Sequence, residues 1–170
     1  MNYIATTKAI KGYKTSKLAA SETNDCVVRA IASAFDITYN QSHKLCAEKM
    51  NRRNRKGVLT FYFHGFLSQS EILGKSVKEI TMEPVKVEST RTDRYWGDKY
   101  TVTKTLNLYT KRGSKYSAMT VGSFVKQFPK GTYILSVKGH TFTVKDSEII
   151  GNYYDFRAKK VRVEKAFKIN

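Results

Sequence analysis

Cys26 and His140 are the two residues whose types and surroundings could support chemistry together. Cys26 follows the polar residues Asn24 and Asp25 and begins an apolar helical pattern. A cysteine in the first turn of a helix meets unpaired N–H groups and the positive end of the helix dipole, which favour thiolate over thiol. Because the thiolate attacks carbonyl carbons, this position predicts a nucleophile. His140, far downstream in a strand-like run, is its candidate partner.

Two helices are predicted to position the cysteine. Apolar residues recur at helical spacing from about residue 25 to residue 35, and Asp36 ends the pattern. A second helix follows, with Thr38 or Asn40 as its N-cap, and it ends in a basic loop that leads to Gly57. Residues 58–73 are rich in aromatic side chains and predict a further short helix packed on the first two.

Strands are predicted to position the histidine. Residues 75–119 alternate polar and apolar types, which indicates a β-rich insertion. A short helix at residues 121–128 is capped by Thr120 and ends before Pro129. Strands are then expected at residues 133–137, 141–144 and 149–154, and an edge strand within residues 160–169.

Length and composition predict one domain over residues 1–170. A chain of 170 residues with 41% hydrophobic content can bury a sizeable core. Residues 1–20 are basic and lack a clear period, so they are expected to form an arm or short strand on the domain. Early helices followed by a late antiparallel sheet correspond to the α+β class.

Two motifs give the chain a resemblance to a known family. They are Asn24-Asp25-Cys26-Val27-Val28-Arg29-Ala30 and the run from Gly131-Thr132-Tyr133 to His140. In this order the chain resembles the papain-like cysteine peptidase superfamily, and most closely its small phage and bacterial members. The resemblance covers about a quarter of the chain closely. It implies a papain-like α+β fold, with N-terminal helices packed on a C-terminal antiparallel sheet.

The resemblance also implies roles for individual residues. Cys26 would be the nucleophile and His140 the acid–base residue of a Cys-His site. The family usually orients the imidazole with an Asn or Asp on the next strand. Asn152 is the first choice for this third member and Asp155 the second, whereas Asp146 is expected to hold the turn between strands.

The oxyanion donors are one place where the chain departs from the family. The backbone N–H of Cys26 would be one donor. Papain-type enzymes add a glutamine about six residues earlier, and that position here holds Ala20. Asn24 could supply an amide donor instead. The alternative is that Asn24, or Asp25, caps the helix.

The net charge of +17 predicts an acidic partner. The cations concentrate in a basic loop and near the C-terminus. The candidate contacts with nucleic acid or an acidic partner are Arg52, Arg53, Arg55, Lys56, Arg157, Lys159, Lys160 and Arg162. Tyr95 and Trp96 beside Arg91 and Arg94 could stack on nucleobases, or could fold onto the core. The other reading of the charge is that it aids solubility and has no specific partner.

Other functions find less support in the sequence. Metal-ligand clusters and Gly-rich phosphate loops are absent, so no metal or cofactor is expected. No apolar stretch is long enough to span a membrane, and the first residues do not form a secretory signal, which favours a cytoplasmic protein. Cys46 is expected to be a buried small hydrophobe, His43 a solvated residue and His64 a packed ring.

These observations favour a cysteine hydrolase. It would act as a peptidase, isopeptidase or amidase on a peptide or protein substrate, for which an acidic sequence is one option. The resemblance suggests that it is phage-encoded and acts in the host cytoplasm or in a virion. The alternative is a non-catalytic basic protein that binds nucleic acid or an acidic host protein.

Overall fold

The protein divides into two compact units, Met1–Ile80 with Thr120–Asn170, and Thr81–Met119. The computed structural model describes residues 3–80, 83–93, 95–112, 115–151 and 159–170. The expected insertion at 75–119 thus begins later, because residues 75–79 pair within the sheet of the first unit.

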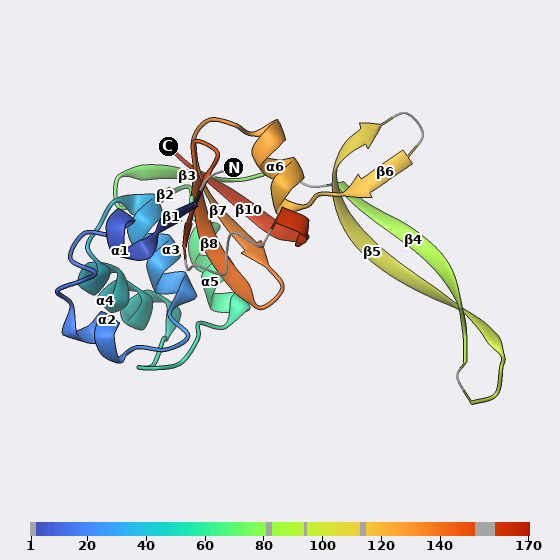
Figure 1. Ribbon diagram of the computed structural model, residues 1–170, viewed down its shortest axis with the longest axis horizontal. Coiled ribbons are helices and arrows are strands. Elements are labelled where there is room, and N and C mark those ends of the chain that lie inside the picture. The colour runs from blue at the N-terminus through green and yellow to red at the C-terminus, as the bar shows by residue number, and fades with distance from the viewer. Residues whose placement is uncertain (1–2, 81–82, 94, 113–114, 152–158) are drawn as a thin grey trace. The chain divides into compact units, whose positions relative to one another are not determined.

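A seven-stranded sheet forms the centre of the first unit, in the order β1-β9-β8-β7-β10-β3-β2 (Figure 1). Its strands are β1 (Tyr3–Ala5), β2 (Glu71–Ile72), β3 (Lys75–Glu79), β7 (Thr132–Val137), β8 (His140–Lys145), β9 (Glu148–Gly151) and β10 (Val163–Ile169). The α+β class is confirmed. The sheet, expected to be antiparallel, is mixed, because β1 pairs with β9 in parallel.

The last strand does not lie at an edge as expected. β10 pairs with β7 on one side and with β3 on the other. Its residues Val163, Ala166, Phe167 and Ile169 are buried. β10 is therefore an interior strand of the sheet with several buried side chains. The polar and apolar residues of such a strand need not alternate strictly.

Helices cover both faces of this sheet. They are α1 (Thr6–Ala9), α2 (Lys17–Ser21), α3 (Cys26–Phe35), α4 (Tyr39–Met50), α5 (Thr60–Leu67) and α6 (Val121–Gln127). The first 20 residues, expected to form an arm or short strand, contain the short strand β1 and, beyond the prediction, α1 and most of α2. A local signal starts α2, because Ser16 is its N-cap and the Ser16 side chain accepts a hydrogen bond from Ala19 N.

Local signals set the ends of the helices that carry or support the site. Thr38 and Gln41 form a capping box at the start of α4. Thr120 caps α6, as its sequence predicts. Asp36 adopts a left-handed conformation with φ of 57° and ends α3.

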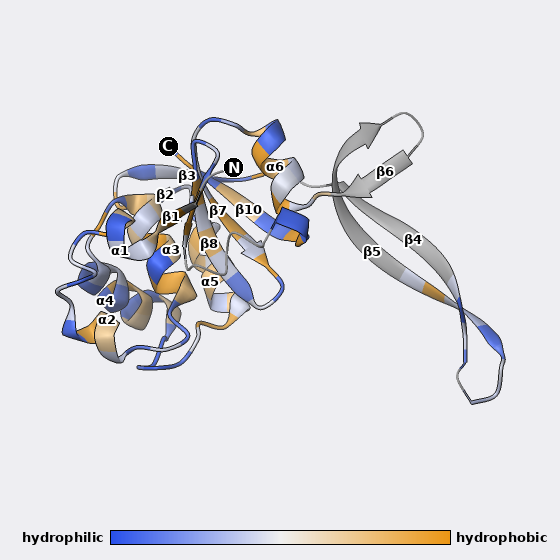
Figure 2. Ribbon diagram, viewed as in Figure 1, coloured by the Kyte–Doolittle hydropathy of each residue, from blue (hydrophilic) through white to orange (hydrophobic). Residues whose placement is uncertain are grey.

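The core lies between the sheet and the helices α3, α4 and α5. Ile134 of β7 and Phe167 of β10 are fully buried against this layer, together with Val28 and Ile31 of α3. Figure 2 shows apolar residues along α3, β7 and β8. On the opposite face Tyr133 meets Phe124 of α6 edge-on, with their ring centroids 5.2 Å apart. Ile134 and Tyr133 of β7 therefore pack on opposite faces of the sheet, because successive side chains of a strand alternate between its faces.

The second unit is a three-stranded antiparallel sheet of β4 (Glu83–Thr92), β5 (Lys99–Arg112) and β6 (Lys115–Ala118). In the turn between β4 and β5, Asp93 Oδ1 accepts hydrogen bonds from the N–H groups of Tyr95 (2.8 Å) and Trp96 (2.9 Å). The two aromatic side chains are 88% and 84% exposed. The tip of this hairpin thus presents both rings to solvent.

Within the described ranges, no helix combines the length and the apolar character that crossing a membrane requires. The same residues contain no group of three or more His, Cys, Asp or Glu side chains that could hold a metal ion.

Candidate active site

Cys26 is the first residue of α3. Asn24 precedes it with φ of 54°, a left-handed conformation in which Asn is enriched among non-glycine residues. This turn brings the chain into the helix at Cys26. The Cys26 side chain is half-buried. Cys26 therefore lies at the positive end of α3, as the sequence predicts.

His140 is the first residue of β8 and pairs with Val137 of β7 across the turn Lys138-Gly139. Gly139 has φ of 69°, a left-handed conformation that glycine adopts without strain. Cys26 and His140 line the same cavity, and His140 lowers the pKa of the Cys26 thiol. The structure thus brings together the two residues that the sequence selected.

The environment of Cys26 favours its thiolate. Burial alone would raise the pKa of the thiol. The hydrogen bond and the charge of His140 act in the opposite direction, as do the N–H groups of Thr141 and Val27, and together they lower the pKa below its ordinary value. Cys46 shows the opposite case, since burial outweighs the charge of Arg52 and the hydrogen bond of Ser42 and raises its pKa to about 12. The thiol of Cys46 is fully buried, as expected.

Helix α3 and strand β8 are joined directly behind the site. Thr143 is fully buried in β8, and its hydroxyl donates a 2.9 Å hydrogen bond to the carbonyl oxygen of Ala30. The Ser33 hydroxyl donates a 2.8 Å hydrogen bond to the Thr143 hydroxyl. These contacts fix the helix that carries the sulfur against the strand that carries the imidazole.

A cavity of about 450 Å³ opens onto the pair. Cys26, Arg29 and His140 line it, with Asn24 beside them. Its other walls include Gly57 and Val58, from the loop after α4, and Gly139. The sulfur and the imidazole therefore face a space that can accept part of a substrate.

A buried polar group supports the start of α3. Asp25 is 2% exposed, and its carboxylate pairs with Arg29 and accepts a 2.8 Å hydrogen bond from the hydroxyl of Tyr39. Asp25 occupies the N-cap position but makes no side-chain cap hydrogen bond. Its carboxylate instead faces the interior, so the expected capping role is corrected.

Asn24 is the side chain that the sequence suggests as an oxyanion donor. Asn24 lines the cavity, and its Nδ2 donates a long 3.5 Å hydrogen bond to the carbonyl oxygen of Arg55. Ala20, at the position where papain-type enzymes carry glutamine, is an exposed residue of α2. The candidate third members Asn152 and Asp155 lie outside the described residues, as does Arg157.

The other two histidines have structural partners. His43 is 7% exposed and contacts Glu22, so the expectation that it is solvated is wrong. His64 packs against Phe63 and Phe167 and lies 3.2 Å from the hydroxyl of Ser136. Burial, together with the charge of Lys165, lowers the pKa of His64. It is therefore a packed ring, as the sequence suggested.

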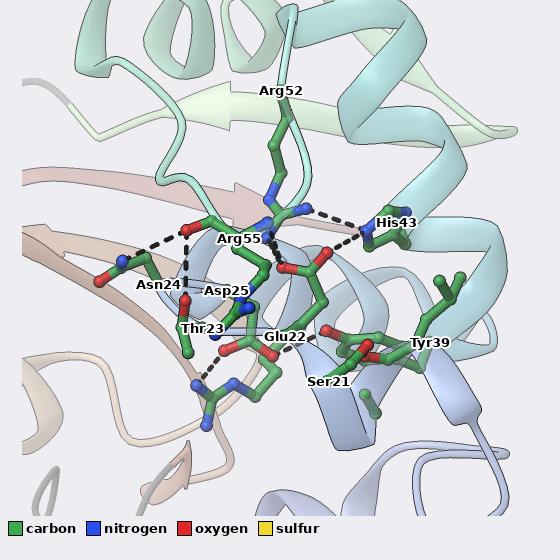
Figure 3. A network of polar contacts seen from close by, with 12 residues as sticks. Ser21, Glu22, Thr23, Asn24, Asp25, Tyr39, His43, Arg52 and Arg55 are labelled. Atoms are coloured by element: carbon green, nitrogen blue, oxygen red, sulfur yellow. Dashed lines mark hydrogen bonds and ion pairs between the residues drawn. The ribbon is translucent and has the colours of Figure 1, made fainter.

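Arg52 is not available to an external partner, which corrects the sequence prediction. Its side chain is 1% exposed and forms a 2.6 Å ion pair with Glu22, as Figure 3 shows. The remaining described cations of the candidate partner surface are exposed. They are Arg53, Arg55, Lys56, Lys159, Lys160 and Arg162.

Sequence reasoning missed the buried network around Glu22. One carboxylate there contacts Arg52, His43 and the backbone N–H of Arg55 (Figure 3). One signal in the sequence could have indicated it. Glu22 is the first acidic residue of the chain, and all charged side chains before it are lysines. A single acid among many bases is a natural partner for an arginine that has to be buried.

Comparisons with known proteins find no match for this chain among protein-family models, curated proteins or solved structures. The chemistry of Cys26 and His140 in the cavity is therefore the basis for a functional proposal.

Proposed function

We propose that the protein is a papain-like cysteine hydrolase that cleaves an amide or ester through an acyl-enzyme. The observation that carries the proposal is that Cys26, at the start of α3, and His140, at the start of β8, line one cavity of about 450 Å³. His140 also lowers the pKa of the Cys26 thiol. A thiol at a helix N-terminus beside an imidazole is the arrangement that activates sulfur nucleophiles.

The residues at the site suffice for a two-step reaction. The Cys26 thiolate adds to the substrate carbonyl carbon, and the electron pair of the carbonyl bond moves to its oxygen. When the intermediate collapses, the leaving amine or alcohol takes a proton from the His140 imidazolium. His140 then accepts a proton from water, the resulting hydroxide attacks the acyl carbon, and the Cys26 thiolate is expelled.

The oxyanion of each intermediate needs N–H donors. The backbone N–H of Cys26 is available in principle, because the first N–H groups of a helix have no partner within it. Asn24 lines the same cavity, and its weak 3.5 Å hydrogen bond to Arg55 could be exchanged for one to the oxyanion. These two groups would replace the glutamine of papain-type enzymes.

Active-site labelling tests this proposal. Iodoacetamide at pH 7 should modify Cys26 faster than it modifies glutathione, and intact-mass analysis should show one adduct. The Cys26→Ala variant should lose the adduct, because the buried Cys46 does not react. Labelling of Cys26 at or below the rate of glutathione would contradict the proposal.

A second function, nucleic-acid binding, is favoured by a separate observation in the second unit. Tyr95 and Trp96 are almost fully exposed at the hairpin tip, and Arg91 and Lys99 are exposed on the adjoining strands. Aromatic rings interleaved with cations are typical of surfaces that bind single-stranded nucleic acid. A gel-shift titration with oligo(dT) tests it, because affinity should fall steeply as salt rises.

A further inference from the structure

Two walls of the active-site cavity come from short connecting segments. One wall contains Gly57 and Val58, at the end of the loop after α4. The other contains Gly139 and His140, from the β7–β8 turn. A substrate that reaches Cys26 therefore passes between these two segments.

The loop after α4 is held in place by the buried carboxylate of Glu22. Glu22 Oε2 accepts hydrogen bonds from Arg52 Nη2 at 2.6 Å and from the backbone N–H of Arg55 at 2.8 Å. The carbonyl oxygen of Arg55 accepts hydrogen bonds from the side chains of Thr23 and Asn24 (Figure 3). Arg55 has φ of 60°, which non-glycine residues rarely adopt, so several contacts together fix its backbone.

The acidic groups next to the cavity are already neutralised. Asp25, which lines it, is buried and paired with Arg29. Glu22, behind the loop, is paired with Arg52. Neither carboxylate is left to balance further positive charge at the entrance.

Exposed cations adjoin, in sequence, the lining residues of both walls. Arg53, Arg55 and Lys56 lie within the four residues before Gly57, and Lys138 directly precedes Gly139. Within the described part of the chain, no ion pair involves any of these four side chains. The segments beside the cavity therefore carry positive charge without an ion-pair partner, on a loop whose backbone is held by hydrogen bonds at Arg55.

We infer that the cavity accepts an acidic peptide, whose carboxylates face Arg53, Arg55 and Lys56 on one wall and Lys138 on the other. This inference rests on the proposed function and names the substrate class of the same site. Charge complementarity supports it, because opposite charges near a cleft raise the local concentration of a ligand. A peptide fits the proposed amide cleavage, whereas a nucleic acid has no amide or ester carbonyl at its backbone.

Two peptidyl vinyl sulfones that differ only in two flanking residues, Glu-Glu or Gln-Gln, test the inference. The second-order rate constant for modification of Cys26 should be roughly five- to tenfold larger for the acidic probe at low salt, and the preference should shrink at 0.5 M salt, as for a screened interaction (order-of-magnitude expectations). A triple variant Arg53→Gln, Arg55→Asn, Lys56→Gln should lose most of the preference. Asn is chosen for position 55 because it tolerates positive φ.

The matched control removes three cations elsewhere, in the triple variant Lys49→Gln, Lys126→Gln, Lys130→Gln. These residues are exposed and do not adjoin the lining segments Gly57–Val58 and Gly139–His140 in sequence, so the preference should remain. The His140 imidazolium attracts the acidic probe equally in both triple variants, so its effect cancels in the comparison.

The possible results separate the inference from the proposed function. Equal rates for the two probes, or an equal loss of preference in both triple variants, would overturn the acidic-substrate inference and leave the nucleophile intact. Failure of both probes to modify Cys26 would overturn the proposed function, and the inference with it. Protection of Cys26 by oligo(dT) at lower concentration than by oligo-glutamate would assign the entrance to nucleic acid instead.

Discussion

The hydroxyl of Tyr39 donates a 2.8 Å hydrogen bond to Asp25 Oδ2, which connects the first residue of α4 to the residue directly before Cys26. Both side chains are buried, with exposed fractions of 0% and 2%. The start of α3 is thus fixed by a polar contact in the interior. A buried contact of this kind is costly to break, because the remaining partner loses both water and its hydrogen bond.

Tyr39→Phe is expected to lower the free energy of unfolding by about 1–3 kcal/mol, since one oxygen of the buried Asp25 carboxylate loses its donor. Urea denaturation followed by circular dichroism measures the change. Tyr62→Phe is the matched control, because Tyr62 is 40% exposed, and it should cost under about 0.5 kcal/mol. Equal effects of the two substitutions would show that the Asp25 contact contributes nothing specific.

The pH dependence of Cys26 alkylation should reflect its lowered pKa. Its midpoint is expected below that of an ordinary thiol, which is about 8.5. His140→Gln should move the midpoint upward, because the hydrogen bond and the charge of His140 both stabilise the thiolate. Hydrolysis of any identified substrate should fall by roughly a hundredfold or more in the same variant.

Iodoacetamide kinetics between pH 5 and about pH 10 measure this midpoint, with thiolate reactivity as the readout. His64→Gln is the control, because His64 contacts Ser136 and Phe167 rather than Cys26. It should leave the midpoint of Cys26 unchanged. A midpoint that does not move in His140→Gln would separate the imidazole from the thiol and contradict the proposed pair.

The helices were predictable from sequence because their signals are local. The apolar period of residues 26–35 and the caps Thr38 and Thr120 each act within a few residues. The Cys26–His140 pair was predictable through its motifs and their order. Its geometry required the fold, since Thr143 and Ser33 fix β8 against α3 across 110 residues of sequence.

Features that depend on distant partners were not predictable in this way. The sequence of β10 predicts an edge strand, and the pairing of β10 with β3 appears only in the structure. Arg52 reads as one of several loop cations, and only its ion pair with Glu22 distinguishes it from the exposed Arg53. A charge pattern gives the number of cations in a loop. Whether one of these cations is buried depends on an acidic partner from a distant segment, as Glu22 is for Arg52.

The stability of the first unit should depend on pH through Glu22. Burial would raise its pKa, but hydrogen bonds from Arg52, His43 and the N–H of Arg55 outweigh burial and lower the pKa to about 2. A carboxyl with a lowered pKa stabilises the fold above the pKa of the unfolded chain, about 4.5. This contribution, on the order of 3 kcal/mol at most, is lost as pH falls from about 4.5 to about 2.

Glu22→Gln is therefore expected to be destabilising at pH 7, with a difference from the parent protein that narrows as pH falls toward 2. Urea denaturation at several pH values measures this difference. Glu48→Gln is the matched control, because Glu48 is exposed and only 3.8 Å from Lys44, and it should have little effect at any pH. A Glu22→Gln difference that stays constant between pH 7 and pH 3 would contradict the assigned role of the carboxylate.

Thr143→Val tests the connection between α3 and β8. The substitution keeps the shape of the side chain but removes the hydroxyl that joins Ser33 to the carbonyl oxygen of Ala30. It should lower the free energy of unfolding by about 1 kcal/mol and slow the alkylation of Cys26 at pH 7. Thr132→Val, in β7, is the control and should preserve the alkylation rate. An unchanged rate in Thr143→Val would show that the Cys26–His140 pair does not need this contact.

Trp96 is the only tryptophan of the chain, so its fluorescence reports on the hairpin tip alone. Because the side chain is 84% exposed, its emission should be that of a solvated indole, and acrylamide should quench it almost as well in the native protein as in urea. If the tip stacks on nucleobases, oligo(dT) should quench the emission at low salt, and Arg91→Gln should weaken this effect. Blue-shifted emission that acrylamide cannot quench would contradict the exposure of Trp96, and unchanged emission with oligo(dT) would exclude stacking at this tip.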